Sequence, residues 1–339
     1  MNEFYNKMKY FEQTEGIPAE IYYHYTSLEA LYNIVSSRTF RLTSLKTSND
    51  KKELYYKPET FLKDAKVIAE KEKDENTKRY FRLIEESLYQ NTPQFLKECK
   101  QKTYPYALCL SEKKDNLTHW DRYAANCTGV CIGFNISALC VLMQRLVITT
   151  FGVGLYDVGK VLYAPDQKEK CIRNSLVNIA NMLGKAEEID SSNIIELVRR
   201  NGYLYATSAY MQTAKFVKDD SFVDEDEVRL YHDSESIKST IRLIDSLLPD
   251  VDKELQANLK KHFNDFVASL HIAEEKFYMS ARGIRSYKEL CLEDVWGSGV
   301  IPEIILGPMC VQNKSELKRF LRANGLEGTR VSISSVPIR

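Results

Sequence analysis

The sequence predicts an α+β protein with a central mixed or antiparallel sheet and large helical insertions. Short runs rich in Tyr, Val, Ile, Phe and Leu predict strands, and they occur from one end of the chain to the other. Longer segments with apolar residues at spacings of three and four predict helices between them. Because the strands are not confined to one half, we expect a single mixed domain over residues 1–339 with a helical insertion at residues 234–300.

Eight segments have the composition of strands, with β-branched and aromatic residues bounded by turn-forming residues. They are Glu20–Tyr25, Thr39–Thr43, Tyr104–Leu110, Gly129–Phe134, Lys160–Tyr163, Glu227–His232, Glu303–Leu306 and Thr329–Ser334.

Helical patterns fill the longer segments between these strands. Ser27 has the position of an N-cap before an apolar stripe made of Leu28, Leu31, Ile34 and Val35. Further helices are expected across Lys51–Lys100, Asp166–Lys215 and Ser234–Ala281, and in a C-terminal segment closed by Gly325.

Charge balance and hydropathy exclude several classes of protein. The chain has 47 basic and 47 acidic residues, so it has no overall excess of positive charge for nucleic acid, although a local basic groove is compatible with it. No run approaches the roughly 18 apolar residues of a membrane span. The N-terminal MNEFYNKMKYFEQTEG lacks the apolar core of a secretory signal. We therefore expect a cytoplasmic protein with no membrane partner.

The eight cysteines are scattered without a CxxC pair, which predicts reduced thiols. Cys127 and Cys131 could seed a metal site with His119. Zinc sites favour more closely spaced cysteines and a second matched pair, so we expect no bound metal.

Familiar catalytic motifs are absent. The chain has no GxGxxG, GxxxxGK[ST], GxSxG or HExxH, so dehydrogenase, P-loop and hydrolase functions have no support. His24 sits near the end of a strand with Thr26 on the same side, where an imidazole and a hydroxyl can bind paired sugar hydroxyls; a packing role explains His24 as well. Asn49 and Asp50 either cap the next helix or contribute to a site.

Two later segments carry further candidates. Trp120 and Tyr123 are three residues apart on a short helix, so they either form a wall for a flat ring or pack in the core. Glu225, Glu227 and Arg229 alternate along a predicted strand and so point the same way, either on an exposed edge or in a buried site where the Arg keeps a carboxylate ionised.

Five of these motifs, taken in order, resemble the bacterial family called domain of unknown function 2971 (DUF2971). They are His24–Thr26, Asn49–Asp50, Trp120–Phe134, Glu225–Arg229 and Ile304–Pro308. The resemblance spans residues 20–310 with interruptions, and the long helical stretch between His232 and Ile301 departs from it. The family name implies no activity.

The first motif is also similar to the opening of ADP-ribosyltransferases of the His-Tyr-Glu type, which implies a split sheet and NAD as substrate. By position, His24 would hold the adenosine ribose, Tyr123 or Trp120 would stack on nicotinamide, and Glu227 or Glu225 would be the catalytic carboxylate. Arg229 would contact the pyrophosphate or brace a Glu. The NAD contacts implied in this way are His24, Tyr25, Thr26, Asn49, Trp120, Tyr123 and Arg229.

Three functions follow as hypotheses. The first is an ADP-ribosyltransferase acting on a protein, RNA or DNA acceptor, as a toxin or antiviral defence effector. The second is a non-catalytic module that binds a nucleotide or nucleic acid and reaches an antitoxin or other partner protein through the helical insertion. The third is a metal-dependent nuclease that uses Glu225, Glu227, Asp50 and magnesium.

Overall fold

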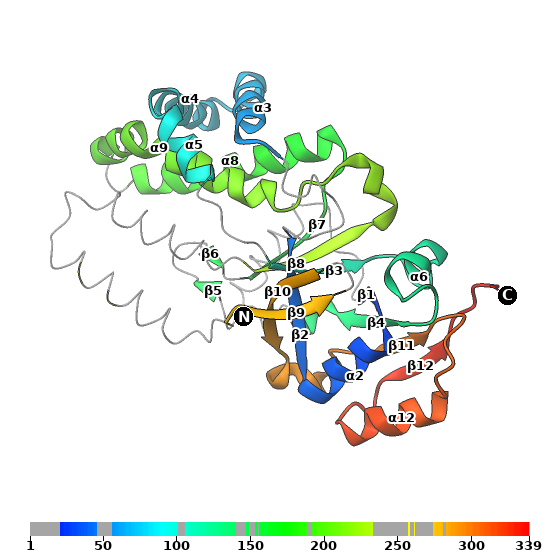
Figure 1. The fold of residues 1–339 in the computed structure, drawn as a ribbon. Helices are drawn as coiled ribbons and strands as arrows, with labels where there is room; N and C mark the ends of the chain where they lie inside the picture. Colours follow the sequence, from blue (N-terminus) through cyan, green and yellow to red (C-terminus); the bar gives the residue numbers. More distant parts are fainter. Residues whose placement is uncertain are drawn as a thin grey trace.

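Figure 1 shows the fold of the computed structural model, in which an open sheet lies beside a separate group of helices. The structure describes residues 21–45, 56–100, 106–139, 147–148, 153–154, 156–188, 191–232, 257, 261, 274–280 and 283–338.

A ten-stranded sheet organises the described part of the chain, and its main path runs β12-β11-β4-β1-β3-β2-β10-β9. β8 pairs with β3 and β7, off this path. Only β11 and β12 are parallel neighbours, so the sheet is mixed and mostly antiparallel, as predicted. The strands are β1 (Ile21–Thr26), β2 (Thr39–Ser44), β3 (Tyr106–Ser111), β4 (Val130–Asn135), β7 (Tyr156–Lys160), β8 (Glu227–His232), β9 (Lys276–Ser280), β10 (Gly283–Cys291), β11 (Glu303–Leu306) and β12 (Arg330–Ile333). A separate short pair consists of β5 (Val147–Ile148) and β6 (Val153–Gly154).

The sheet splits along one edge of β3. On that edge Ser111 pairs with Tyr23 of β1, while Tyr106 and Ala107 at the other end pair with β2. The opposite edge of β3 pairs with β8 over its whole length. The segment 108–110 therefore lies in a split between β1 and β2, and its ladder pairing among the described strands is with β8.

The two faces of the sheet are covered differently. One face carries the main apolar core, which α2 (Leu28–Ser37), α12 (Lys314–Ala323) and the 3-10 helix η3 (Glu293–Ser298) cover. α6 (Leu117–Tyr123) lies against the other face, where Trp120 packs on Tyr25 with ring centroids 5.0 Å apart. The Ser27 hydroxyl caps α2 as predicted, accepting from the Ala30 amide at 3.1 Å.

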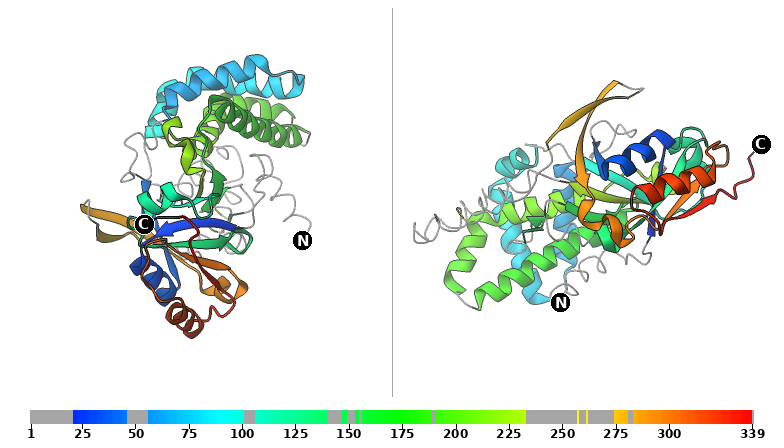
Figure 2. Two further views of the ribbon diagram at one scale, coloured as in Figure 1. Left: turned by 90° about the vertical axis from the view of Figure 1, so that its right-hand side faces the viewer. Right: turned by 90° about the horizontal axis from the view of Figure 1, so that it is seen from below.

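Five helices form a second apolar core away from the sheet. They are α3 (Pro58–Lys71), α4 (Glu75–Gln90), α5 (Thr92–Lys100), α8 (Pro165–Glu187) and α9 (Ser191–Ala214). The views in Figure 2 show this group on one side of the molecule. α8 follows β7 and α9 leads back through the 3-10 helix η2 (Asp220–Glu225) into β8, so the helical pair is inserted between two neighbouring strands. None of the described helices is long and apolar enough to cross a membrane.

The predicted α+β class is confirmed, with two corrections in the elements. The strand expected at Lys160–Tyr163 is instead β7, which ends at Lys160, and Leu162 makes only an isolated bridge with Val217. The insertion expected to be helical over residues 234–300 lies largely outside the described residues, but its last part is the β9–β10 hairpin followed by η3. Gly283, the first residue of β10, pairs with Ser280 of β9 and has φ +105°, a backbone conformation that favours glycine.

The turn between α6 and β4 depends on Gly129. Ala125, Asn126 and Cys127 all have positive φ, and the Gly129 amide donates to the Ala124 carbonyl at 2.8 Å. A Cβ at Gly129 would lie 2.2 Å from the Thr26 carbonyl oxygen. No side chain fits here, so Gly129 holds α6 close to β1.

We expect Gly129→Ala to lower the free energy of unfolding by about 3 kcal/mol, because backbone atoms must move to admit the methyl group. Urea unfolding measures the change. Gly328→Ala is the matched control, since nothing lies within 4 Å of its Cβ position. Equal stabilities for the two variants would show that the close packing of the α6–β4 turn is not needed.

Candidate functional site

The predicted Glu and Arg side chains meet in a buried cluster at the start of β8. Glu227 and Arg229 share one face of β8, as alternation predicts, and Arg229 Nε donates to Glu227 Oε1 at 2.8 Å. Glu225 does not lie on the strand as expected. It ends η2, and Asp226 then takes a left-handed conformation with φ 41°, so the chain turns before β8 begins.

Lys218, which follows α9, joins the two carboxylates. Its Nζ donates to Glu225 Oε2 at 2.6 Å and to Glu227 Oε2 at 2.8 Å. Arg229 Nη2 adds a bond to Glu227 Oε2 at 3.2 Å, and the Tyr123 hydroxyl donates to Glu225 Oε1. We call Lys218, Glu225, Glu227 and Arg229 the carboxylate cluster. Two negative and two positive groups balance within it, and every carboxylate oxygen has a donor.

The charges inside the cluster control the protonation of Glu227. Burial alone would raise the pKa of this carboxyl, but the positive charges of Arg229 and Lys218 outweigh it and lower the pKa from 4.5 to about 2. Burial and the neighbouring Glu225 carboxylate raise the pKa of Tyr123, so this phenol stays protonated and donates. At neutral pH the cluster therefore holds an ionised Glu227.

Cys109 links the cluster to the split in the sheet. It is the direct partner of Arg229 across β3 and β8, and its side chain is exposed. Part of the side chain is exposed, but the protein around the thiol reduces its hydration. This desolvation, as the largest cause, and the negative charge of Glu227, as the next, raise the pKa of the thiol well above its usual value. The side chain is therefore reachable by solvent while protein surrounds it on most sides, and its thiol hydrogen-bonds to Glu227.

The His24 side chain, on β1, hydrogen-bonds to the backbone carbonyl of Cys109. Its Nδ1 lies 2.9 Å from the Cys109 carbonyl oxygen, in the split where neither β1 nor β2 pairs with β3. A carbonyl only accepts, so Nδ1 carries the proton and Nε2 presents a lone pair. Removal of water around the ring lowers the pKa of His24, which makes this neutral tautomer the form at pH 7.

Strand alternation places His24 and Glu227 on opposite faces of the sheet. Tyr23 pairs with Ser111 and Ser111 pairs with Glu227, so these three share a face and His24 points to the other. Accordingly the His24 ring contacts Phe40, which belongs to the main core. His24 bonds the Cys109 carbonyl from one face, and Cys109 pairs with Arg229 on the other side of β3, so among the described residues Cys109 lies between the two groups.

The remaining predicted site residues have other roles. Trp120 is fully buried and donates to Asp115, so it is a packing residue and not a free surface for stacking. Tyr25 is buried with its hydroxyl bonded to the Lys113 carbonyl at 2.7 Å, and half-buried Thr26 pairs with Val130. Arg229 is fully buried and bonds the Lys215 carbonyl at 3.0 Å, which makes it a brace for Glu227. Asn49 and Asp50 lie outside the described residues.

The described residues do not bring three or more His, Cys, Asp or Glu side chains together in an arrangement that could hold a metal ion. The set considered from the sequence, Cys127 and Cys131 with His119, is not assembled. Both ring nitrogens of His119 are engaged, one with Asn116 at 3.0 Å and the other with the Glu225 carbonyl at 3.1 Å.

Sequence reasoning missed Lys218 and a further buried carboxylate, Glu303. Glu303 accepts from the Tyr23 hydroxyl at 2.9 Å, from Lys114 at 2.8 Å and from Arg330 at 2.6 Å. It lies in the same cross-sheet row as Tyr23 and Glu227. A single charge within the apolar strand Glu303–Leu306 was the available signal. Lys218 gave none, because its contacts depend on how α9 returns to the sheet.

A protein-family model matches the segment that contains this site. Residues 119–230 match the model of the family described as "Protein of unknown function (DUF2971)". The DUF2971 segment contains Tyr123 and the whole carboxylate cluster, while His24 lies outside it. No curated protein and no solved structure matches the chain.

The low pKa of Glu227 predicts a loss of stability in acid. Its pKa of about 2 lies below its ordinary value of 4.5, so the stabilisation is complete above about pH 4.5 and is lost as the pH falls through 2. The loss should be about 3 kcal/mol. Urea unfolding at pH 7, 4, 3 and 2 measures it, and Glu227→Gln should flatten this part of the profile. Parallel profiles for wild type and Glu227→Gln would contradict the assignment. Glu196→Gln, at an exposed helix position, serves as control.

Proposed function

We propose that the chain is an ADP-ribosyltransferase-like enzyme that uses NAD as its substrate and transfers ADP-ribose to a protein or nucleic-acid acceptor. The observation that carries the proposal is the state of His24: a neutral imidazole in the split of a sheet, fixed through Nδ1 and presenting Nε2 as an acceptor. A ribose hydroxyl is a donor suited to such a nitrogen.

The carboxylates of the cluster would supply the chemistry that the reaction needs. Loss of nicotinamide from NAD leaves positive charge on the ribose, and a carboxylate fixed beside that carbon stabilises the oxocarbenium-like transition state. Glu227 is ionised at neutral pH and lies on a rigid strand, so it is the candidate for this role. Glu225 would position the ribose or the acceptor through the same Lys218 and Tyr123 contacts.

The edge of β3 that neither β1 nor β2 pairs with at residues 108–110 would lie along the path of the substrate between the two groups. NAD is an extended dinucleotide, so its adenosine ribose and nicotinamide ribose can lie at different points along the split. His24 binds the Cys109 carbonyl, and the exposed Cys109 thiol bonds Glu227, so a molecule following the split passes from one group to the other. Tyr123, half-buried beside Glu225, is the aromatic side chain available for the nicotinamide ring.

One observation favours a non-catalytic nucleotide-binding module as the second candidate. All four oxygens of Glu225 and Glu227 already have donors within the protein, so the carboxylates are engaged in a buried ion-pair cluster. A protein that binds NAD without consuming it would fit this second function.

The proposal predicts that His24 and Glu227 affect NAD turnover in different ways. His24→Asn can still donate to the Cys109 carbonyl but has no second ring nitrogen, so KM for NAD should rise about tenfold. Glu227→Gln should reduce kcat at least about 100-fold, because the transition-state charge loses its partner. Nicotinamide release, measured with and without cell extract as a source of acceptor, follows both.

Glu316→Gln, on the exposed face of α12, is the control and should match wild type. If wild type binds NAD but releases no nicotinamide under either condition, the non-catalytic module replaces the enzyme. If NAD does not bind at all, both candidates fail.

A further inference from the structure

The inserted helical pair α8–α9 is tied to the carboxylate cluster at both of its ends. Tyr163, two residues before α8, accepts from the Glu227 amide through its hydroxyl at 3.2 Å. Lys215, directly after α9, accepts from Arg229 through its carbonyl, and Lys218 follows three residues later. The segment before α8 and the segment after α9 are therefore both hydrogen-bonded to residues of β8.

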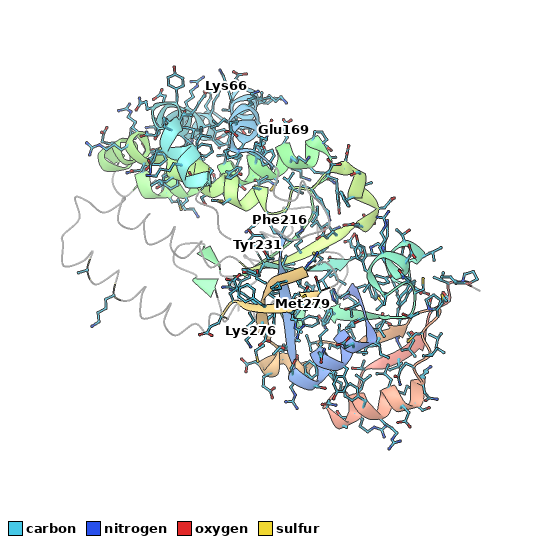
Figure 3. The ribbon with its side chains drawn as sticks, in the orientation of Figure 1. Lys66, Glu169, Phe216, Tyr231, Lys276 and Met279 are labelled. Atoms are coloured by element: carbon cyan, nitrogen blue, oxygen red, sulfur yellow. The ribbon has the colours of Figure 1, made fainter. Side chains whose placement is uncertain are left out.

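These two segments are also bonded to each other. The Leu162 amide donates to the Phe216 carbonyl at 2.7 Å, and the Lys218 amide donates to the Leu162 carbonyl at 3.2 Å. Phe216 contacts Tyr231 of β8, and Figure 3 shows these two labelled side chains between the helical group and the sheet. Lys218 therefore lies in a short segment that joins the end of α9 to the sheet.

The two cations of the cluster are anchored differently. Arg229 belongs to β8 itself, is 0% exposed, and contacts one carboxylate. Lys218 comes from the segment after α9, retains 8% exposure, and contacts both carboxylates. Arg229 is thus part of the sheet, while Lys218 is supplied by the segment that follows the helical pair.

We propose that Lys218 is an autoinhibitory contact. Its ammonium group occupies the place where Glu225 and Glu227 would meet the positive charge of a substrate, and movement of the α8–α9 pair withdraws it. This inference rests on the proposed function, because it assigns a regulator to the same carboxylates. It explains why a site with two ionisable carboxylates has no oxygen without a donor in the structure.

Nicotinamide release from NAD by the full chain tests the contact. Lys218→Met removes the ammonium and keeps most of the side-chain volume, so the rate should rise at least tenfold above wild type. Lys218→Arg keeps the charge and should stay at the wild-type rate. Lys215→Met is the matched control, since the Lys215 ammonium lies over the rings of Phe216 and Tyr231, 5.3 and 5.4 Å from their centroids, and contributes its carbonyl to the cluster.

A rate for folded Lys218→Met at or below wild type would overturn the inference, because Lys218 would then support the reaction. Lys218→Gln, which can still donate to a carboxylate, replaces Lys218→Met if the latter does not fold. The melting temperature of each variant identifies the folded ones.

A binding measurement separates failure of this inference from failure of the proposed function. The probe is 1-methylnicotinamide, a cation with the charged ring of NAD but no ribose to transfer. Calorimetric titration should give at least tenfold tighter binding to Lys218→Met than to wild type, with Lys215→Met unchanged. If no variant releases nicotinamide but Lys218→Met binds 1-methylnicotinamide more tightly than wild type, the proposed reaction is wrong and the autoinhibitory role of Lys218 stands. Equal affinity for all three proteins overturns the contact.

Discussion

The buried ion pairs between β8 and the segment after α9 are the interaction on which the rest of the structure depends. Isolated charges are costly to bury, and they persist in a protein interior only when paired and hydrogen-bonded. Glu227 meets this condition through Arg229 on its own strand and Lys218 on the insertion. Glu225 extends this network through its backbone, because its carbonyl oxygen accepts hydrogen bonds from the Ser111 hydroxyl at 2.8 Å and from His119 Nε2. One cluster therefore holds β3, β8, α6 and the ends of the helical pair in register.

The split in the sheet creates a second requirement, which His24 meets. Buried carbonyls need a donor, and the Cys109 carbonyl lies on the edge of β3 that neither β1 nor β2 pairs with at that residue. The imidazole supplies this donor through Nδ1. The same bond determines which nitrogen is left as an acceptor, so the side chain that satisfies the Cys109 carbonyl also has an unprotonated ring nitrogen. This is why His24 can be both a packing residue, in contact with Phe40, and the candidate ribose ligand.

Part of this arrangement could be predicted from the sequence, because it depends on local patterns. β8 begins and ends where alternation placed it, and Glu227 and Arg229 share a face as expected. Glu225 was placed wrongly on that strand, because the left-handed turn at Asp226 has no clear signal in DEDE. The β9–β10 hairpin was not predicted, because the helical pattern before it was extended through these residues, although Gly283 stands at the start of β10. Lys218 could not be predicted at all, since it meets the carboxylates only after the chain returns from two long helices.

The central claim is that His24 presents an unprotonated Nε2 to a ribose hydroxyl of NAD. The ¹⁵N NMR signals of the His24 ring test this most directly, assigned by comparison with His24→Asn. The account predicts a protonated Nδ1 and a bare Nε2 at pH 7, and a shift of the Nε2 signal when NAD is added. A ring protonated on both nitrogens, or an Nε2 signal unchanged at saturating NAD, would contradict it.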